Sequence, residues 1–275
     1  MDITSTFDSG NIEVVDSQDV GNVRLKIKVD HGSEHLQWFH YRVCGVRDEN
    51  LVMHLENAGA ASYPGGWENY RAVASYDRKK WFRVPTSFDG KALTIRHKPE
   101  CGAVYYAYFA PYSQERHADL IATAQLNRAV KLSVLGQTID GRDMDLLTVG
   151  TPGRNKKAFW VIARQHPGET MAEWWMEGFI GRLLDDDDPM ARKLREACVF
   201  YIVPNMNPDG SFRGHLRTNT SGANLNREWG VATMQGSPEV KLVMDKMHDT
   251  GVDFCLDVHG DEALPYNFIA GAEGV

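Results

Sequence analysis

Cysteine is scarce in this chain of 275 residues, with four cysteines spread over positions 44, 101, 198 and 255. No two of them form a C-x-x-C pair, so we expect neither a disulfide framework nor a cysteine-ligated zinc site. Cys198 and Cys255 lie in apolar runs that predict buried strands, where a thiol behaves as a small hydrophobic side chain. This usage of cysteine favours a reducing compartment, the cytoplasm.

Long hydrophobic runs and an excess of basic residues are also missing. No apolar run approaches the roughly 20 residues that span a bilayer, and the polar N-terminus lacks the pattern of a signal peptide. The chain has 30 Lys and Arg against 37 Asp and Glu, a formal net charge of −7. We therefore expect no membrane and no nucleic acid as partner. The sequence leaves the oligomeric state open.

Short apolar segments separated by Gly, Pro, Asp and Asn clusters fill residues 1–112. Apolar and polar residues alternate strictly over 23–29, as they do in a half-buried strand. Several short strands at this spacing predict an all-β sandwich domain over 1–112.

Helical and strand patterns alternate from about residue 113 onward. Helices are expected over 114–128, 169–184 and 237–251, buried strands over 157–165, 198–205 and 253–260, and a hairpin over 130–150. Ser237 is expected to cap the last helix and Gly251 to end it. The helix over 169–184 has an apolar face that includes Trp175. This alternation predicts an α/β domain over 113–275, built on a mixed sheet flanked by helices.

Two histidines follow predicted strands of this α/β domain. His166 comes after one buried strand and His259 after another, and Glu169 lies three residues after His166. The H-x-x-E spacing occurs four times in the chain, so the position at the strand ends carries the argument. Two histidines, a carboxylate and an open water position form the ligand set of catalytic zinc.

A polar loop over 207–229 separates the two histidines. It contains Arg213, Arg217 and Arg227, with Asn226 beside the last. One guanidinium can hold a carboxylate bidentately and another can stabilise an oxyanion. The alternative for this loop is a set of solvated arginines without function.

Four ordered motifs resemble those of M14 zinc carboxypeptidases. They are H-P-G-E at 166–169, N-P-D-G at 207–210, R-x-N-x-x-G-x-N-L-N-R-x-W at 217–229 and D-V-H-G-D-E at 257–262. The resemblance is strongest to the cytosolic carboxypeptidase subfamily, which places a β-sandwich before the catalytic domain. It implies a hydrolase that removes residues from the C-termini of peptides or protein tails, acidic tails among them.

The resemblance also implies a role for each candidate residue. His166, Glu169 and His259 would hold one Zn²⁺, and Arg217 would stabilise the oxyanion. The substrate-binding pair, Asn226 and Arg227, would hold the free C-terminal carboxylate. The motif at 207–210 would form a turn that shapes the site. An acidic substrate would need a basic groove, to which Arg213 is a candidate contributor.

Two departures from the family pattern stand out. Asn224 replaces an aspartate that accepts a hydrogen bond from a zinc histidine, and a neutral amide still orients the ring but raises its basicity less. Glu262 and Glu273 are the only glutamates after His259, and neither lies at the distance of the general base of the family. We therefore expect the 275 residues to be part of a longer chain.

Three other functions remain open from the sequence. A zinc amidase or deacylase acting on a non-peptide or cell-wall amide would use the same ligands. A chain that truly ends at Val275 would favour a catalytically silent module that binds tails. A structural protein without a metal is the third alternative.

Overall fold

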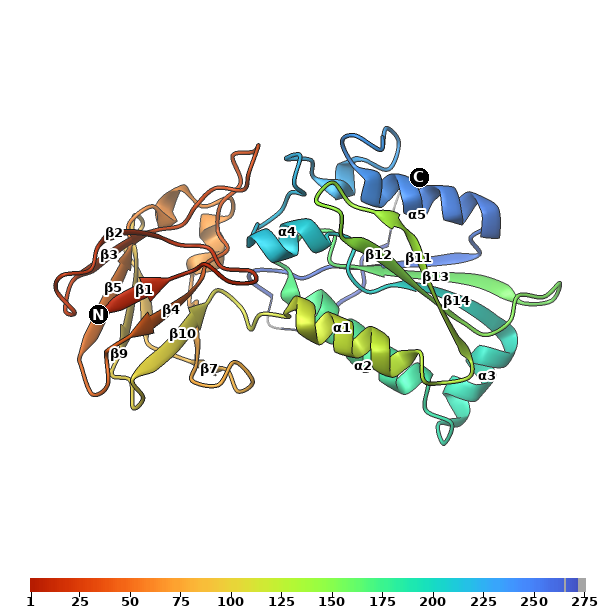
Figure 1. Cartoon of the computed structure of the whole chain (residues 1–275), viewed down its shortest axis with the longest axis horizontal. Coiled ribbons are helices and arrows are strands. Elements are labelled where there is room, and N and C mark those ends of the chain that lie inside the picture. The colour runs from red at the N-terminus through yellow and green to blue at the C-terminus, as the bar shows by residue number, and fades with distance from the viewer. Residues whose placement is uncertain (265, 272–275) are drawn as a thin grey trace.

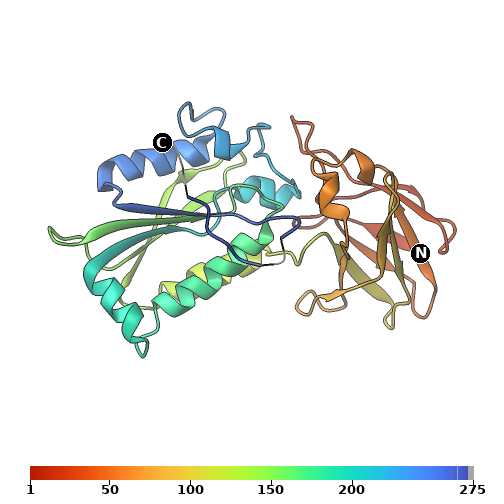
Figure 2. The same cartoon turned by 180° about the vertical axis from the view of Figure 1, so that it is seen from behind.

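The computed structural model describes residues 1–264 and 266–271, so Glu273 lies outside the described residues. Its β-rich N-terminal part and its α/β part lie side by side, as Figures 1 and 2 show. Among the described residues, no helix combines the length and the apolar composition needed to cross a bilayer.

The N-terminal part is a sandwich of two five-stranded sheets. One sheet has the order β1 (Asp2–Thr4), β4 (His40–Cys44), β10 (Ala103–Ala107), β6 (Val73–Ser75) and β7 (Phe82–Arg83). The other has the order β2 (Glu13–Asp16), β3 (Val23–Lys26), β5 (Leu51–Leu55), β9 (Leu93–His97) and β8 (Thr86–Phe88). Two short 3-10 helices, η1 (Ala58–Ala60) and η2 (Pro64–Trp67), lie in the connections. The predicted β-sandwich is confirmed.

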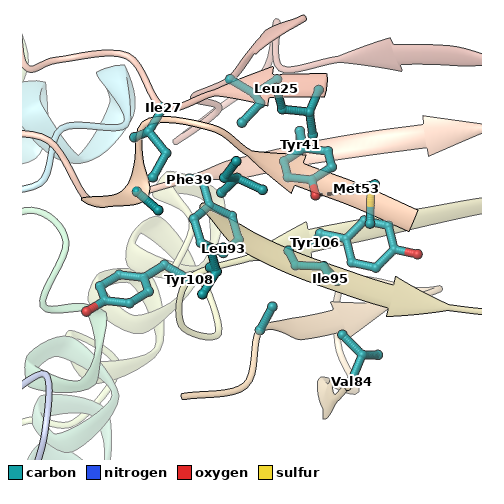
Figure 3. Packing of buried hydrophobic residues seen from close by; sticks show 14 of the residues in the cluster. Leu25, Ile27, Phe39, Tyr41, Met53, Val84, Leu93, Ile95, Tyr106 and Tyr108 are labelled. Atoms are coloured by element: carbon teal, nitrogen blue, oxygen red, sulfur yellow. Dashed lines mark hydrogen bonds between the residues drawn. The ribbon is translucent and has the colours of Figure 1, made fainter. Parts of the chain in front are cut away.

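The core of the sandwich forms where the strand pattern points its apolar residues inward. In β3, Val23 and Leu25 are buried while the two residues that alternate with them are exposed, as predicted, but the strand ends at Lys26 and Val29 is exposed, so the predicted strand over 23–29 is too long. Figure 3 shows Leu25 with Met53 of the same sheet and Tyr41 of the facing sheet. The Tyr41 hydroxyl donates to the Met53 sulfur at 3.2 Å, so even this buried phenol is hydrogen-bonded.

The C-terminal part contains one mixed five-stranded sheet. Its order is β11 (Val130–Gln137), β12 (Asp143–Val149), β14 (Cys198–Val203), β13 (Lys157–Ala163) and β15 (Phe254–Val258). The helices are α1 (Gln114–Ala124), α2 (Thr170–Leu183), α3 (Pro189–Ala197), α4 (Pro208–Arg213) and α5 (Pro238–Thr250), with the short η3 (Leu225–Arg227). β13 is parallel to both β14 and β15, whereas β11 and β12 form the predicted antiparallel hairpin.

Helices cover both faces of this sheet (Figure 1). Val161 of β13 faces α1 and α2 within one apolar cluster, and its neighbour Ile162 faces α5 within another. Successive residues of a strand point to opposite faces, so a continuous apolar run is what a strand buried on both faces requires. The predicted mixed sheet flanked by helices is confirmed.

Ser237 occupies the N-cap position of α5 and Gly251 ends the helix, as predicted, although the Ser237 hydroxyl donates to a Glu228 carboxylate oxygen at 2.9 Å instead of bonding to the helix. Two other local predictions are wrong. The strand predicted to be buried over 253–260 has no buried residue, and Cys255 is exposed, since β15 is the edge strand of the described sheet. Trp175 is 40% exposed, and it stacks on Phe179 at a centroid distance of 5.0 Å instead of entering the core.

A buried polar cluster connects α1 and α2 to the end of β13. His117 Nδ1 lies 2.6 Å from Glu173 Oε1, and His117 Nε2 lies 3.4 Å from Asp145 Oδ2. The other Glu173 oxygen accepts from Arg164 Nη1 at 2.7 Å. Burial by itself lowers the pKa of His117, but hydrogen bonds to Asp145 and Glu173 outweigh it and raise the pKa to about 9.

The raised pKa of His117 means that the protonated ring stabilises the folded state. We predict that this stabilisation is lost in alkaline solution. A histidine with a folded pKa above its unfolded value of 6.5 stabilises the fold fully below pH 6.5. Its contribution then disappears as the pH rises through about 9. Thermal unfolding from pH 6 to 10 measures this loss, and we expect the alkaline loss of stability to be smaller in His117→Gln by at least about 1 kcal/mol.

His97→Gln is the matched control, because burial lowers the pKa of His97. This variant should keep the alkaline loss of the wild type. A His117→Gln protein with an unchanged pH profile would contradict the prediction.

Candidate metal centre

The parallel register of β13 and β15 brings the two candidate histidines together. Ala163 pairs with Val258, so the chain leaves both strands at the same edge of the sheet. His166 Nδ1 lies 2.6 Å from Glu169 Oε1, and His259 Nδ1 lies 2.9 Å from Glu169 Oε2. One ligand atom from each of the three residues lies within 4.8 Å of the others. Two imidazole nitrogens and a carboxylate oxygen facing one point fit a zinc ion with an open coordination position.

Outer hydrogen bonds orient both imidazole rings. His166 Nε2 lies 3.1 Å from Asn224 Oδ1, and His259 Nε2 lies 3.0 Å from Asp257 Oδ2. Acceptors at both Nε2 atoms hold a ring proton there, so each Nδ1 atom can bind a metal once it is deprotonated and no longer donates to Glu169. The predicted contact of Asn224 with a histidine of the site is confirmed.

The charges of the cluster also suit a cation. Burial by itself raises the pKa of Glu169, but hydrogen bonds from His166 and His259 outweigh it and lower the pKa to about 2. Burial by itself lowers the pKa of His259, but hydrogen bonds to Asp257 and Glu169 raise it to about 10. The buried carboxylate thus attracts positive charge, which a divalent metal supplies when its ligands are deprotonated.

The backbone of the H-P-G-E segment is held from several sides. Arg164, with a positive φ of 57°, donates from Nε to the Pro167 carbonyl at 3.0 Å. The Gly168 N–H donates to the Leu216 carbonyl at 2.8 Å. The Gly260 N–H donates to Glu169 Oε2 at 2.9 Å. These bonds fix the ligand segment to both the 207–229 loop and the end of β15.

The N-P-D-G motif at 207–210 ties the loop to the sheet. It begins helix α4 instead of forming only the predicted turn, and the Asn207 carboxamide oxygen caps the helix by accepting from the Gly210 N–H at 3.0 Å. Asn207 Nδ2 donates to the Gln165 carbonyl at 3.0 Å. Asp209 is fully buried and accepts from the Thr138 hydroxyl at 2.8 Å. The motif therefore shapes the site through the backbone beside His166.

The candidate substrate-binding pair follows Asn224 directly. Asn226 and Arg227 lie in η3, which begins one residue after the side chain that contacts His166. Asn226 is half-buried, and Arg227 is exposed with its Nη1 donating to the Asn226 carbonyl at 3.1 Å. The pair thus lies on the turn that adjoins the histidine cluster.

Arg217 and Arg213 differ in their surroundings. Arg217 is half-buried. Burial of the His35 ring lowers the pKa of His35, and the nearby positive charge of Arg217 lowers it further. The Arg213 guanidinium instead binds Asp140 with its Nε and Nη2 at 2.7 and 2.8 Å. The charge of Arg213 is therefore neutralised, which counts against its predicted place in a basic groove.

Sequence reasoning missed several residues that support the cluster. Asp257, beside His259, accepts from Gln165 Nε2 at 2.6 Å, and Gln165 Oε1 accepts from Trp229 Nε1 at 2.9 Å. Asp257 stands in the D-V-H-G motif, two residues before His259. Residues at this spacing in an extended segment point to the same side, so the sequence could have identified Asp257 as a partner of His259. No local pattern marks Gln165.

The fold and the cluster define the class of protein: a metallohydrolase whose metal lies at the strand ends of a mixed α/β sheet. Residues 117–268 match the family model described as zinc carboxypeptidase, and residues 3–109 match the model of the cytosolic carboxypeptidase N-terminal domain. The chain belongs to the zinc carboxypeptidase family. It is a hydrolase of the exopeptidase class with one Zn²⁺ as cofactor. The domain boundary near residue 113 stays a prediction.

Similar proteins cover almost all of this chain. An uncharacterized protein of Zymomonas mobilis is 51% identical over 100% of this chain and 71% of its own length. The crystal structure of a metallo-carboxypeptidase from Burkholderia cenocepacia has 54% identity and a TM-score of 0.94, covering 96% of this chain and 71% of the other. Cytosolic carboxypeptidase 6 of Mus musculus is 28% identical; the match covers 96% of this chain and spans about half of the mouse protein, 54%.

Gly168 packs so closely against the 207–229 loop that we predict any side chain at residue 168 to destabilise the fold. A Cβ atom at residue 168 would lie 2.9 Å from the Leu216 carbonyl oxygen and 3.0 Å from its Cδ1. We expect Gly168→Ala to lower the free energy of unfolding by about 1–3 kcal/mol, measured by urea denaturation. Gly178→Ala in α2 is the control, since a Cβ there meets nothing within 4 Å and alanine favours the helix. Equal stability of the two variants would contradict this prediction.

Proposed function

We propose that this protein is a cytoplasmic metallocarboxypeptidase that removes residues one at a time from the C-termini of peptides or protein tails. The observation that supports it best is the convergence of His166, Glu169 and His259 beside the turn that carries Asn226 and Arg227. A metal next to a carboxylate-binding pair is the arrangement that an exopeptidase needs, because the scissile bond adjoins the terminal carboxylate.

Each part of the chain has a task in this proposal. His166, Glu169 and His259 would hold the zinc ion, which supplies an activated water and polarises the scissile carbonyl when bound. Asn226 and Arg227 would bind the terminal carboxylate, the guanidinium by paired hydrogen bonds. Arg217 would stabilise the negative charge that develops on the carbonyl oxygen.

The charges of the loop support these two arginine roles. Among the described residues, neither Arg217 nor Arg227 forms a salt bridge, in contrast to Arg213. Both cations are therefore available to a substrate. The relative from Pseudomonas aeruginosa, 47% identical with a TM-score of 0.93, was solved in complex with (2-guanidinoethylmercapto)succinic acid. The carboxylates of such a ligand are the groups that we assign to Asn226 and Arg227.

The finer proposal is that the residues removed include C-terminal glutamate. The resemblance to the cytosolic subfamily supports it, while the net charge of −7 opposes an acidic tail at long range. The unpaired charges of Arg217 and Arg227 would have to offset this repulsion locally.

Mass spectrometry of a mixed peptide pool tests the activity. The product of the intact gene, loaded with zinc, should shorten free C-termini by single residues and spare the same peptides with an amidated C-terminus. The residues lost identify the specificity, including any preference for glutamate. Equal hydrolysis of free and amidated C-termini would instead favour an amidase. A pool left unchanged by a protein with one zinc per chain would favour a catalytically silent binding module.

Zinc content tests the ligand assignment without any substrate. Glu169→Gln removes a charged metal ligand and should weaken zinc binding more than about 100-fold. The loss of a residue that only hydrogen-bonds to a ligand already weakens metal binding about 10- to 100-fold. Elemental analysis after dialysis against a zinc buffer measures it. Glu262→Gln, which changes an acid three residues after His259, should retain the metal. Full zinc occupancy in Glu169→Gln would exclude Glu169 as a ligand.

The carboxylate-binding role of Arg227 is tested on the same loop. Arg227→Ala should lower kcat/KM on free C-termini about 100-fold, as expected for a lost charge-assisted pair, with zinc still bound. Arg213→Ala removes an arginine that is already paired with Asp140, so its kcat/KM should stay within about threefold of wild type. Equal activity of the two variants would remove Arg227 from the substrate site.

A further inference from the structure

A carboxylate of the β-sandwich binds the backbone around Arg217. Asp30 Oδ1 accepts from the Leu216 N–H at 2.6 Å, and Asp30 Oδ2 accepts from the Arg217 and Thr218 N–H groups at 2.7 and 2.9 Å. The Thr218 hydroxyl donates to the same oxygen at 3.2 Å. Asp30 is 1% exposed, and three consecutive N–H groups around one carboxylate form an anion-binding nest.

The opposite side of this segment contacts the ligand loop. The Leu216 N–H binds Asp30, whereas the Leu216 carbonyl accepts from the Gly168 N–H at 2.8 Å, one residue before Glu169. Asp30 and the H-P-G-E segment thus hold the backbone of Leu216 and Arg217 between them. The distance of Arg217 from the metal ligands depends on both contacts.

We propose that Asp30 is a positioning residue that fixes the Arg217 guanidinium over the reacting carbonyl. The proposal rests on the proposed oxyanion role of Arg217. A flexible side chain can act on a developing charge only if its backbone is fixed, because a displacement of about 1 Å can cost a factor of 100 in rate. The β-sandwich is therefore a working part of the active site.

Other contacts of the β-sandwich with this loop provide the matched control. Asn11 Nδ2 donates to the Gly214 carbonyl at 2.8 Å, and the Ser9 N–H donates to the Phe212 carbonyl at 2.8 Å. Asn11 is as buried as a core residue, at 4% exposure, but its contact lies three residues before Arg217. Asn11→Ala thus weakens the same interface, and also removes the Asn11 bonds to the Lys28 backbone, but it removes no hydrogen bond of the nest itself.

Asp30→Asn tests the proposal at constant size. Its amide group would present N–H to at least one of the three N–H donors, so a hydrogen bond is replaced by a repulsive contact. We expect kcat to fall about 10- to 100-fold with KM within about threefold, since Asn226 and Arg227 are unchanged. Hydrogen exchange should accelerate in a peptide covering 216–218. Asn11→Ala should keep kcat within about threefold of wild type.

A double-mutant cycle decides whether Asp30 acts through Arg217. Asp30→Asn combined with Arg217→Ala should have the kcat of Arg217→Ala alone. Two losses that multiply, or an Asp30→Asn variant that behaves like Asn11→Ala, would overturn the proposal. An Arg217→Ala enzyme with wild-type kcat would instead overturn the oxyanion role itself.

Thr218→Val covers the case in which Asp30→Asn does not fold. It removes one hydroxyl bond from the carboxylate and leaves the three backbone bonds in place. A loss of kcat of about two- to fivefold at constant KM is expected. A change confined to thermal stability, with wild-type kcat, would count against the proposal.

Discussion

The site depends on one carboxylate that is shared by two histidines. Glu169 contacts His166 with one oxygen and His259 with the other, and the Gly260 N–H binds the second oxygen as well. These contacts join residues that are up to 91 positions apart in sequence. They are possible because β13 and β15 are parallel neighbours and end at the same edge of the sheet. The geometry of the metal centre follows from this strand register.

Around the shared carboxylate, a second set of buried polar groups fixes the ligand segment. Arg164 binds the Pro167 carbonyl and the Glu173 carboxylate, and Glu173 contacts His117 of α1. Buried charges are costly unless they are paired and hydrogen-bonded, and this set satisfies that condition. The same contacts therefore stabilise the fold and hold the ligand loop.

The β-sandwich takes part in the same construction from outside the catalytic sheet. Its Asp30 binds the backbone of the segment that carries Arg217, and Asn11 binds the Gly214 carbonyl. Gly214 has a φ of 70°, and a Cβ there would lie 2.7 Å from the Ser9 carbonyl oxygen. Such close backbone packing shows that the loop and the sandwich fit each other in detail.

The sequence by itself determined most of the elements and the candidate ligands, although it did not predict helices α3 and α4. Strict alternation over 23–29 and the continuous apolar run of β13 have direct physical causes in one-sided and two-sided burial, so both patterns could be read locally. His166, Glu169 and His259 could be found because ligands follow strands in open sheets.

Only the tertiary structure decided the contacts between distant segments. The exposure of Cys255 depends on which strand lies at the edge of the sheet, and the partner of the Ser237 hydroxyl depends on the position of Glu228. Asp30 carries no local signal, because the nest that it fills is formed 186 residues later in the chain. Periodicity reports which face of an element is buried, but it does not report what lies against that face.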